Sequence, residues 1–437
     1  MLNQTFLFIN CYILLSLQRR KRMLISLNKL TILFFHFVKR FELVILNALV
    51  TLISLGQTVI VTKFLTQEEY GTYGFYLTLS HYIYVIGNWG FLTWGTQSIA
   101  ADLGDKERIY STLMRARILT CGVAFVSLLA YIVWVLNSEN TFALIGFFIY
   151  SMSLILSPEI LFIVENRIRT MVLVNLGIKT VYVIVLFCCL LFFDLSPHVV
   201  FLLFSILTFS TSLALLKALS FRVEFTNLIR GLSVTPIKLS FPNFLITVLS
   251  FVFASAPLIL AGSYMDKKYF SVLYASFAII KMLQAAYNPM IQRIIPRLNE
   301  FMVPKDQVFN AVKSDIISAI IFSITCCVML WLTAPIIVKI VFSSGYKGLE
   351  GSIVLFSLAL IPGLLSTILI SQVAIYLGIV KQAYTALGLV SLVIFSILFF
   401  NIENLDPHLV LETMIFGEWV LLLLMVFFTY KKILSLS

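Results

Sequence analysis

The chain has 437 residues, of which 60% are hydrophobic and 12% are charged, and its mean hydropathy is +1.02. About twelve apolar stretches approach the roughly 20 residues that a helix needs to cross a hydrocarbon core, which excludes a water-soluble protein. These stretches are continuously apolar and do not alternate, which excludes a transmembrane β-barrel. The composition therefore predicts an all-α integral membrane protein.

Hydropathy predicts twelve membrane-spanning helices in chain order. The expected spans are 41–63, 70–92, 115–136, 141–164, 171–193, 198–220, 240–263, 269–291, 314–336, 350–374, 382–402 and 408–430. Most connections between them are short, so successive helices are expected to be antiparallel neighbours.

Positive charge is concentrated at alternate junctions between these spans. The segments on one side hold 24 of the 31 Lys and Arg residues; they are 1–40, 93–117, 165–170, 217–238, 292–313, 375–381 and 431–437. The segments on the other side hold five, namely Lys63, Lys267, Lys268, Lys339 and Lys347. The positive-inside rule therefore predicts that both termini are cytoplasmic. The net charge of +11 follows mostly from this bias and from attraction to anionic membrane lipids, and no basic, aromatic-interleaved run predicts nucleic-acid binding.

The chain divides into two sets of six spans. We expect an N-terminal lobe over 38–220, a cytoplasmic linker over 221–239 and a C-terminal lobe over 240–437. Residues 1–37 are expected to form a cytoplasmic or surface-lying extension, with Met1 or Met23 as the start. A secretory signal is not expected there, because the basic run at 19–22 follows the apolar segment and does not precede it.

Similar polar patterns recur in the two sets. A short charged turn ending in tyrosine follows the first span of each, at 67–71 and at 266–270. Polar residues then recur on one face of the next helix, because steps of three and seven residues return to the same side. They are His81, Tyr84 and Asn88 in the second span, and Lys281, Gln284 and Asn288 in the eighth. With both sets starting in the cytoplasm, these would be parallel repeats.

Three segments resemble a known family. The sequence FLTQEEYGTYG at 64–74 resembles the turn after the first span of bacterial polysaccharide exporters. The segment 156–174, with SPE at 157–159 and ENR at 165–167, is similar to their fourth span and cytoplasmic turn, and 258–298 resembles their seventh and eighth spans. These exporters are the Wzx-type flippases within the superfamily of multidrug, oligosaccharidyl-lipid and polysaccharide exporters.

The resemblance implies a MATE-like fold, in which two six-helix lobes surround a central cavity. It implies a flippase of the bacterial inner membrane, which moves an undecaprenyl-diphosphate-linked oligosaccharide to the periplasmic leaflet by alternating access. O-antigen, capsule or another polysaccharide, lipopolysaccharide included, would be the end product. A polysaccharide polymerase and a chain-length regulator would be the partners, and no enzymatic activity is implied.

Ionisable residues inside the spans are the candidates for function, because each charge costs about 3 kcal/mol at the bilayer centre and is not expected to face lipid. Lys179 in the fifth span and Lys281 in the eighth would bind the diphosphate, or would only pair with carboxylates or helix carbonyls. Polar residues on the same helix faces complete the expected cavity, namely Asn175, Gln284, Asn288, His81 and Asn88. The carboxylates Glu418 and Glu159 are the candidates for binding a coupling ion.

Two other classes of function compete. A multidrug or small-solute cation antiporter of the same superfamily often carries an acidic residue within its first span, whereas the nearest carboxylate here is Glu42, at the end of that span. A membrane polymerase or ligase would need a sizeable periplasmic loop, and the predicted ones are short. The six cysteines and four histidines have no metal-site spacing, so neither a metal nor a cofactor is expected.

Overall fold

The structure of the chain is a computed structural model. It describes residues 46, 49–101, 105–134, 140–165, 167–219, 234–291, 294, 298, 303–304, 307–342 and 346–435, without the side chains of 100, 101 and 289. The predicted extension at 1–37 and residues 221–233 of the predicted linker at 221–239 lie outside these residues.

The described residues form helices and no strand, which confirms the predicted fold class. Within the described residues, each of the twelve predicted spans contains helix, in some cases as two or more elements. The first half holds the helix Leu49–Phe64, α2 (Gln67–Asn88), α3 (Phe91–Ala101), α4 (Lys106–Trp134), α5 (Thr141–Leu156), α6 (Glu159–Val164), α7 (Ile168–Phe192) and α8 (Pro197–Lys217). The second half holds α9 (Thr235–Ala254), α10 (Ala256–Tyr264), α11 (Lys267–Ile291), α13 (Val308–Val341), α14 (Leu349–Ser357), α15 (Leu360–Ile368), the π-helix η4 (Leu369–Val373), α16 (Ala374–Leu377), α17 (Val380–Phe400), η5 (Ile402–Asn404) and α18 (Pro407–Leu434).

Proline accounts for two of the interruptions within predicted spans. The predicted span 141–164 is divided into α5 and α6 at Ser157 and Pro158, and 240–263 is divided into α9 and α10 at Ser255, two residues before Pro257. Proline lacks the backbone donor that continues a helix, and its ring clashes with the preceding turn. The helices are therefore interrupted where hydropathy alone indicates one continuous span.

Ten helices among the described residues are long and apolar enough to cross a membrane, and the chain is a multi-pass membrane protein. α2 has the length but is too polar to be one of the ten, and α11 is the least apolar of the ten. These two helices also pack directly against each other. The most polar pair of long helices therefore lies in the interior of the helix assembly.

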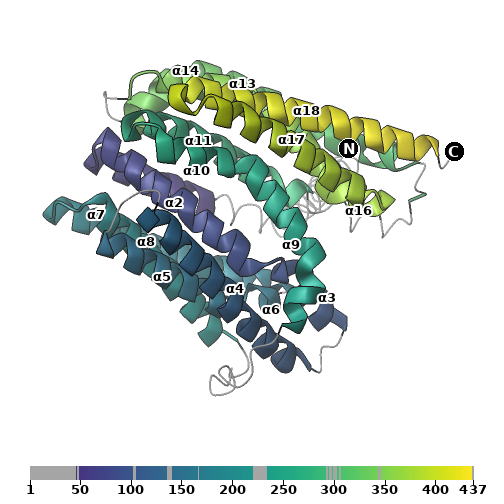
Figure 1. Cartoon of the computed structure of the whole chain (residues 1–437), viewed down its shortest axis with the longest axis horizontal. Helices are drawn as coiled ribbons and strands as arrows, with labels where there is room; N and C mark the ends of the chain where they lie inside the picture. Colours follow the sequence, from purple (N-terminus) through teal and green to yellow (C-terminus); the bar gives the residue numbers. More distant parts are fainter. Residues whose placement is uncertain are drawn as a thin grey trace, which may run out of the picture. The chain divides into compact units, whose positions relative to one another are not determined.

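Residues Val50–Ser437 form one compact unit, in which α2 is central. It contacts α4, α5 and α8 of the first half and α9, α10 and α11 of the second half. In Figure 1 most first-half helices lie on one side of the α2–α11 pair, and α13, α14, α17 and α18 lie on the other. The two predicted sets of spans thus meet along α2.

Both ends of α2 contact the second half. At its start, the Gln67 side chain donates to the Lys268 carbonyl oxygen at 3.1 Å, which brings the two charged turns of the repeat together. At its end, the Trp89 indole N–H donates to the Ile237 carbonyl oxygen at 3.1 Å, and its ring stacks on Phe244 with centroids 3.6 Å apart. In this conformation the halves are joined at both ends of the helix.

Candidate functional site

A polar cluster inside the second half contains three of the predicted site residues. The Lys281 ammonium group donates to the Gln284 side-chain oxygen at 2.9 Å, one turn later in α11. Glu418 in α18 is 9% exposed and accepts a hydrogen bond from the Ser366 hydroxyl in α15 at 3.3 Å. The sequence analysis proposed Lys281, Gln284 and Glu418 separately, and the fold places them on helices that contact one another.

A glycine in α15, Gly363, leaves room for the Gln284 amide and the Glu418 carboxylate beside the helix backbone. A Cβ atom at Gly363 would lie 2.5 Å from the Gln284 amide nitrogen and 3.4 Å from a Glu418 carboxylate oxygen. The amide and the carboxylate therefore lie against the same point of the α15 backbone. The distance between Lys281 and Glu418 exceeds that of a salt bridge, so their charges interact without direct pairing.

Lys179 lies in a different environment. Its ammonium group donates to the Ser54 hydroxyl at 3.0 Å, which joins α7 to the helix Leu49–Phe64. Both Lys179 and Asn175, one turn earlier in α7, are half-buried. The hydrogen-bond partner of Lys179 is thus neutral, and Lys179 forms no salt bridge with a carboxylate of the described residues.

His81 connects α2 to the second half. Its Nδ1 atom is 2.9 Å from the Ser255 hydroxyl at the break between α9 and α10, and its ring packs against Phe251. The side chain is nevertheless exposed, as is Asn288 in α11. His81 is also close enough to Lys281 for their charges to interact. Polar groups from both predicted repeats therefore converge on the α2–α11 contact.

The remaining two candidates, Asn88 and Glu159, surround a residue that the sequence analysis did not select. Arg117 in α4 is 3% exposed. Its guanidinium group donates to the Ser157 carbonyl oxygen at 2.6 Å and to the Asn88 side-chain oxygen at 3.5 Å, and its charge also acts on Glu159. The Arg117 Nε atom is buried without a hydrogen-bond partner among the described residues.

A signal for Arg117 was present in the sequence. Tyr110, Leu113, Cys121 and Ala124 are buried in α4, and Arg117 lies at the helical spacing that puts it on the same face. The sequence analysis instead counted Arg117 with the charged segment at 93–117, at the edge of the third predicted span. An arginine in register with an apolar stripe is the pattern that would have identified it.

The fold does not place all candidates in a single contact network. Lys179 and Lys281 have separate partners, Ser54 and Gln284, in different halves of the chain. No group of three potential His, Cys, Asp or Glu metal ligands occurs in the part of the chain that the structure describes. The shared cavity expected between the two lysines stays a prediction.

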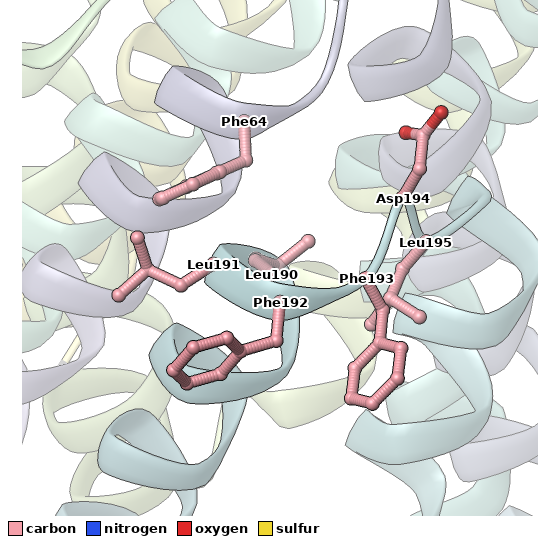
Figure 2. A pocket seen from close by; sticks show the side chains of 7 residues that line it. All are labelled: Phe64, Leu190, Leu191, Phe192, Phe193, Asp194 and Leu195. Carbon is pink, nitrogen blue, oxygen red and sulfur yellow. The ribbon is translucent and has the colours of Figure 1, made fainter.

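Two cavities lie away from these clusters. The first, of about 280 Å³, is lined by Phe64 and the segment 190–195, with Asp194 as its one acidic residue (Figure 2). Figure 2 shows Phe64 above the end of α7, where apolar side chains make up most of the wall. The second cavity, of about 810 Å³, lies at the ends of the helix Leu49–Phe64 and α13. Both are at the predicted periplasmic end of these helices.

No model of a known protein family matches the sequence, and no curated protein matches it. Solved structures do match its fold. The lipid II flippase MurJ in an inward closed conformation matches with a TM-score of 0.66 and 16% identity, over 91% of this chain and 90% of that one. An inward-facing multidrug resistance MATE family transporter of the MOP superfamily matches with a TM-score of 0.64 and 14% identity, over 89% and 95% of the two chains. The eukaryotic MATE transporter AtDTX14 matches with a TM-score of 0.63 and 16% identity, over 90% and 95%. The chain therefore has the fold shared by these transporters and this flippase.

Proposed function

We propose that this protein is a flippase of the bacterial inner membrane. Its substrate would be an undecaprenyl-diphosphate-linked oligosaccharide, moved from the cytoplasmic to the periplasmic leaflet by alternating access for O-antigen, capsule or a related polysaccharide. A polymerase and a chain-length regulator would act on the product. The fold shared with a lipid II flippase supports this class of transporter, and the short predicted outer connections argue against a polymerase or ligase.

One observation carries the proposal: cationic side chains lie inside the helix assembly without a salt bridge to a carboxylate among the described residues. Lys179 and Lys281 are half-buried, Arg117 is buried, and none of the three forms a salt bridge within the described residues. Charges inside a membrane protein are costly and are commonly functional. A diphosphate would neutralise such groups and accept charge-assisted hydrogen bonds, each typically worth about 1.5–3 kcal/mol.

The sugar part of the substrate needs a polar route through the membrane. The exposed surface of His81 and Asn288, together with the low hydropathy of α2 and α11, supports a route along the contact between the two halves. The joined ends of α2 fit an occluded conformation, in which either end could open to begin the next step of the cycle. The lipid tail would remain in the bilayer.

A small-solute cation antiporter is the second candidate function. Glu418 favours it, because a carboxylate that is 9% exposed and lacks a salt-bridge partner in the described structure could bind a proton or another cation. Multidrug MATE transporters also share the fold. In a flippase the same carboxylate would bind the coupling ion, with Glu159 as the alternative site.

Substitution of the two lysines tests the flippase. We expect Lys179→Ala and Lys281→Ala to reduce surface polysaccharide at least tenfold, the factor that the loss of about 1.4 kcal/mol represents. The undecaprenyl-diphosphate-linked unit should accumulate, as measured by mass spectrometry of extracted lipids. Lys179→Arg and Lys281→Arg should restore export in part, because a wide hydrated site requires charge more than shape.

The matched control is Lys431→Ala, which removes an exposed lysine at the end of α18. This variant and both alanine variants should reach the membrane in wild-type amounts. Normal polysaccharide in both alanine variants would assign the lysines to structural pairing. If deletion of the gene leaves polysaccharide intact but sensitises cells to cationic drugs, and Glu418→Gln has the same effect, the protein is an antiporter.

A further inference from the structure

The cavity of about 810 Å³ has an unusual charge. Lys63, Lys339 and Lys347 line it, together with the single carboxylate of Glu350. Lys63 comes from the end of the helix Leu49–Phe64, Lys339 from the last turns of α13, and Lys347 from the connection to α14. Lys63 thus meets two lysines of one distant junction, Lys339 and Lys347, at the same cavity.

This concentration runs against the charge distribution of the whole chain. Only five lysines lie at junctions predicted to face the periplasm, and three of them line this cavity. Lysine is generally scarce on that side of a membrane protein.

The lysines are not neutralised by protein groups. All three are exposed, and none has a carboxylate within 4 Å in the described part of the chain. Among the described residues, the Lys63 ammonium group donates one hydrogen bond, to the Phe342 carbonyl oxygen at 3.5 Å. Three cations that line one cavity repel one another, and an anion bound among them would reduce this repulsion.

The start of α14 adds donors to the same wall. Its N-cap is Gly348, in the left-handed conformation with φ of 82°, and no side chain caps the helix. Glu350 and Gly351 also line the cavity, and backbone N–H groups in a first helical turn lack intrahelical acceptors. Such a turn attracts anions through these donors and the helix dipole.

A buried hydroxyl group also lacks a partner. Tyr346 lines the cavity and is 3% exposed, and its hydroxyl group has no hydrogen-bond partner among the described residues. Its ring is held by Tyr70 and Phe342. A buried hydroxyl usually requires a partner, because leaving it unsatisfied costs about 1–3 kcal/mol. The hydroxyl oxygen is fully buried, so Tyr346 forms part of the cavity wall and its hydroxyl group is out of reach of a ligand there.

We propose that this cavity is a binding site for a phosphate-type anion at the predicted periplasmic end of the protein. The ligand would be either the headgroup of an anionic phospholipid or a phosphate or diphosphate group carried by another molecule. The site has a mixed lining, with ammonium groups and backbone donors beside the apolar Pro335 and Val338. This suits a phosphate ester attached to an apolar chain. The proposal does not depend on the flippase function.

Pyrophosphate binding tests the site. The full-length protein in an uncharged detergent would be titrated with sodium pyrophosphate by calorimetry at low ionic strength. Wild type should bind it saturably, and added salt should weaken binding because the charges are exposed. Lys339→Gln combined with Lys347→Gln should weaken binding about tenfold or more, whereas Lys339→Arg combined with Lys347→Arg should retain it.

The matched control is Lys268→Gln, which removes an exposed lysine on the same predicted side but outside the cavity. It should bind pyrophosphate as wild type does, and all variants should melt at wild-type temperatures without ligand. Absence of saturable binding by wild type, or equal affinity of the double Gln variant, would overturn the proposal.

Lipid nanodiscs distinguish the two sources of the anion. Pyrophosphate binding would be compared, for wild type and for Lys268→Gln, between nanodiscs of phosphatidylcholine alone and nanodiscs that also contain phosphatidylglycerol. If phosphatidylglycerol suppresses binding by wild type but not by Lys268→Gln, the Lys268 position contributes to lipid access and the cavity assignment fails. If it suppresses binding by both proteins equally, a lipid headgroup occupies the cavity. If it suppresses neither, the cavity takes a phosphate group of a different molecule.

Discussion

The charged residues within or beside the helices differ in whether their partners are neutral groups or opposite charges. Arg117 is buried against a helix carbonyl and an amide, Lys281 against an amide, and Lys179 against a hydroxyl. These hydrogen-bond partners are neutral, and the nearest carboxylates, Glu418 for Lys281 and Glu159 for Arg117, interact with the cations without forming salt bridges. Glu165 is the opposite case, because it is bound by Lys106 at 2.6 Å and by Arg167 at 3.3 Å.

Glu165 gives a prediction about pH. The hydrogen bond from Lys106, assisted by Arg167, lowers the pKa of the Glu165 carboxyl group below its ordinary value, which is about 4.3. A lowered folded-state pKa means that the contribution to stability is present above the ordinary value and is lost as the pH falls through the folded-state pKa. We expect Glu165→Gln to destabilise the protein by about 1 kcal/mol at pH 7 and by much less near pH 3.

The measurement is thermal unfolding of the purified protein in detergent across this pH range. Glu403→Gln is the control, because Glu403 is exposed in η5 and has no salt bridge among the described residues. Its melting temperature should follow that of wild type at every pH. A Glu165→Gln effect that stays constant down to pH 3 would contradict the assigned role of the carboxylate.

At the scale of elements, the start of α2 and its packing depend on the segment 64–74, which carried the family resemblance. Thr66 and Glu69 form a reciprocal capping box, in which the Thr66 backbone N–H donates to Glu69 at 2.8 Å and the Glu69 N–H donates to Thr66 at 3.3 Å. Such a box satisfies two donors at the start of a helix. The next residues, Tyr70 and Gly71, are buried against the second half. The motif therefore has a structural role in starting α2 and seating it on α11.

Gly71 gives a prediction about this contact. A Cβ atom there would overlap the Lys267 carbonyl oxygen, and a backbone atom cannot rotate away. We expect Gly71→Ala to destabilise the protein by about 1–3 kcal/mol, because α2 and α11 must move apart. Thermal unfolding in detergent would measure the effect.

Gly122→Ala in α4 is the matched control for Gly71→Ala. It makes the same substitution inside a helix, at a position where a Cβ atom would meet nothing within 4 Å. It should be neutral or stabilise by up to about 1 kcal/mol through helix propensity. Equal melting temperatures for the two variants would show that the close approach of α2 to Lys267 does not limit stability.

At the scale of the whole molecule, the orientation in the membrane rests on charge alone. The segment between α7 and α8 is predicted to be periplasmic, and the end of α18 is predicted to be cytoplasmic. In a protein without its native cysteines, we expect Ser196→Cys to react with a membrane-impermeant thiol reagent in intact cells, because Ser196 is exposed at the start of α8. Ser435→Cys, exposed at the end of α18, should react only after the cells are permeabilised. The reverse labelling pattern would invert the predicted topology.

The sequence by itself predicted the all-α membrane fold, the order of the apolar helical segments and the polar faces of α2 and α11, but not the breaks within several predicted spans. These features follow from local chemistry. A membrane helix forms its backbone hydrogen bonds within its own segment, and the length of an apolar run shows whether it can cross the hydrocarbon core. Helical spacing likewise identified the faces that carry Lys179, Lys281 and their polar neighbours.

Only the tertiary structure decided which groups meet across those faces. The approach of Gln284 and Glu418 at Gly363, the burial of Arg117 and the convergence of Lys63 with Lys339 each join residues on different helices. Spacing along one helix reports the direction of a side chain but not the neighbour that it reaches. That neighbour depends on how helices far apart in sequence pack together, and the packing is set by steric fit at many positions at once.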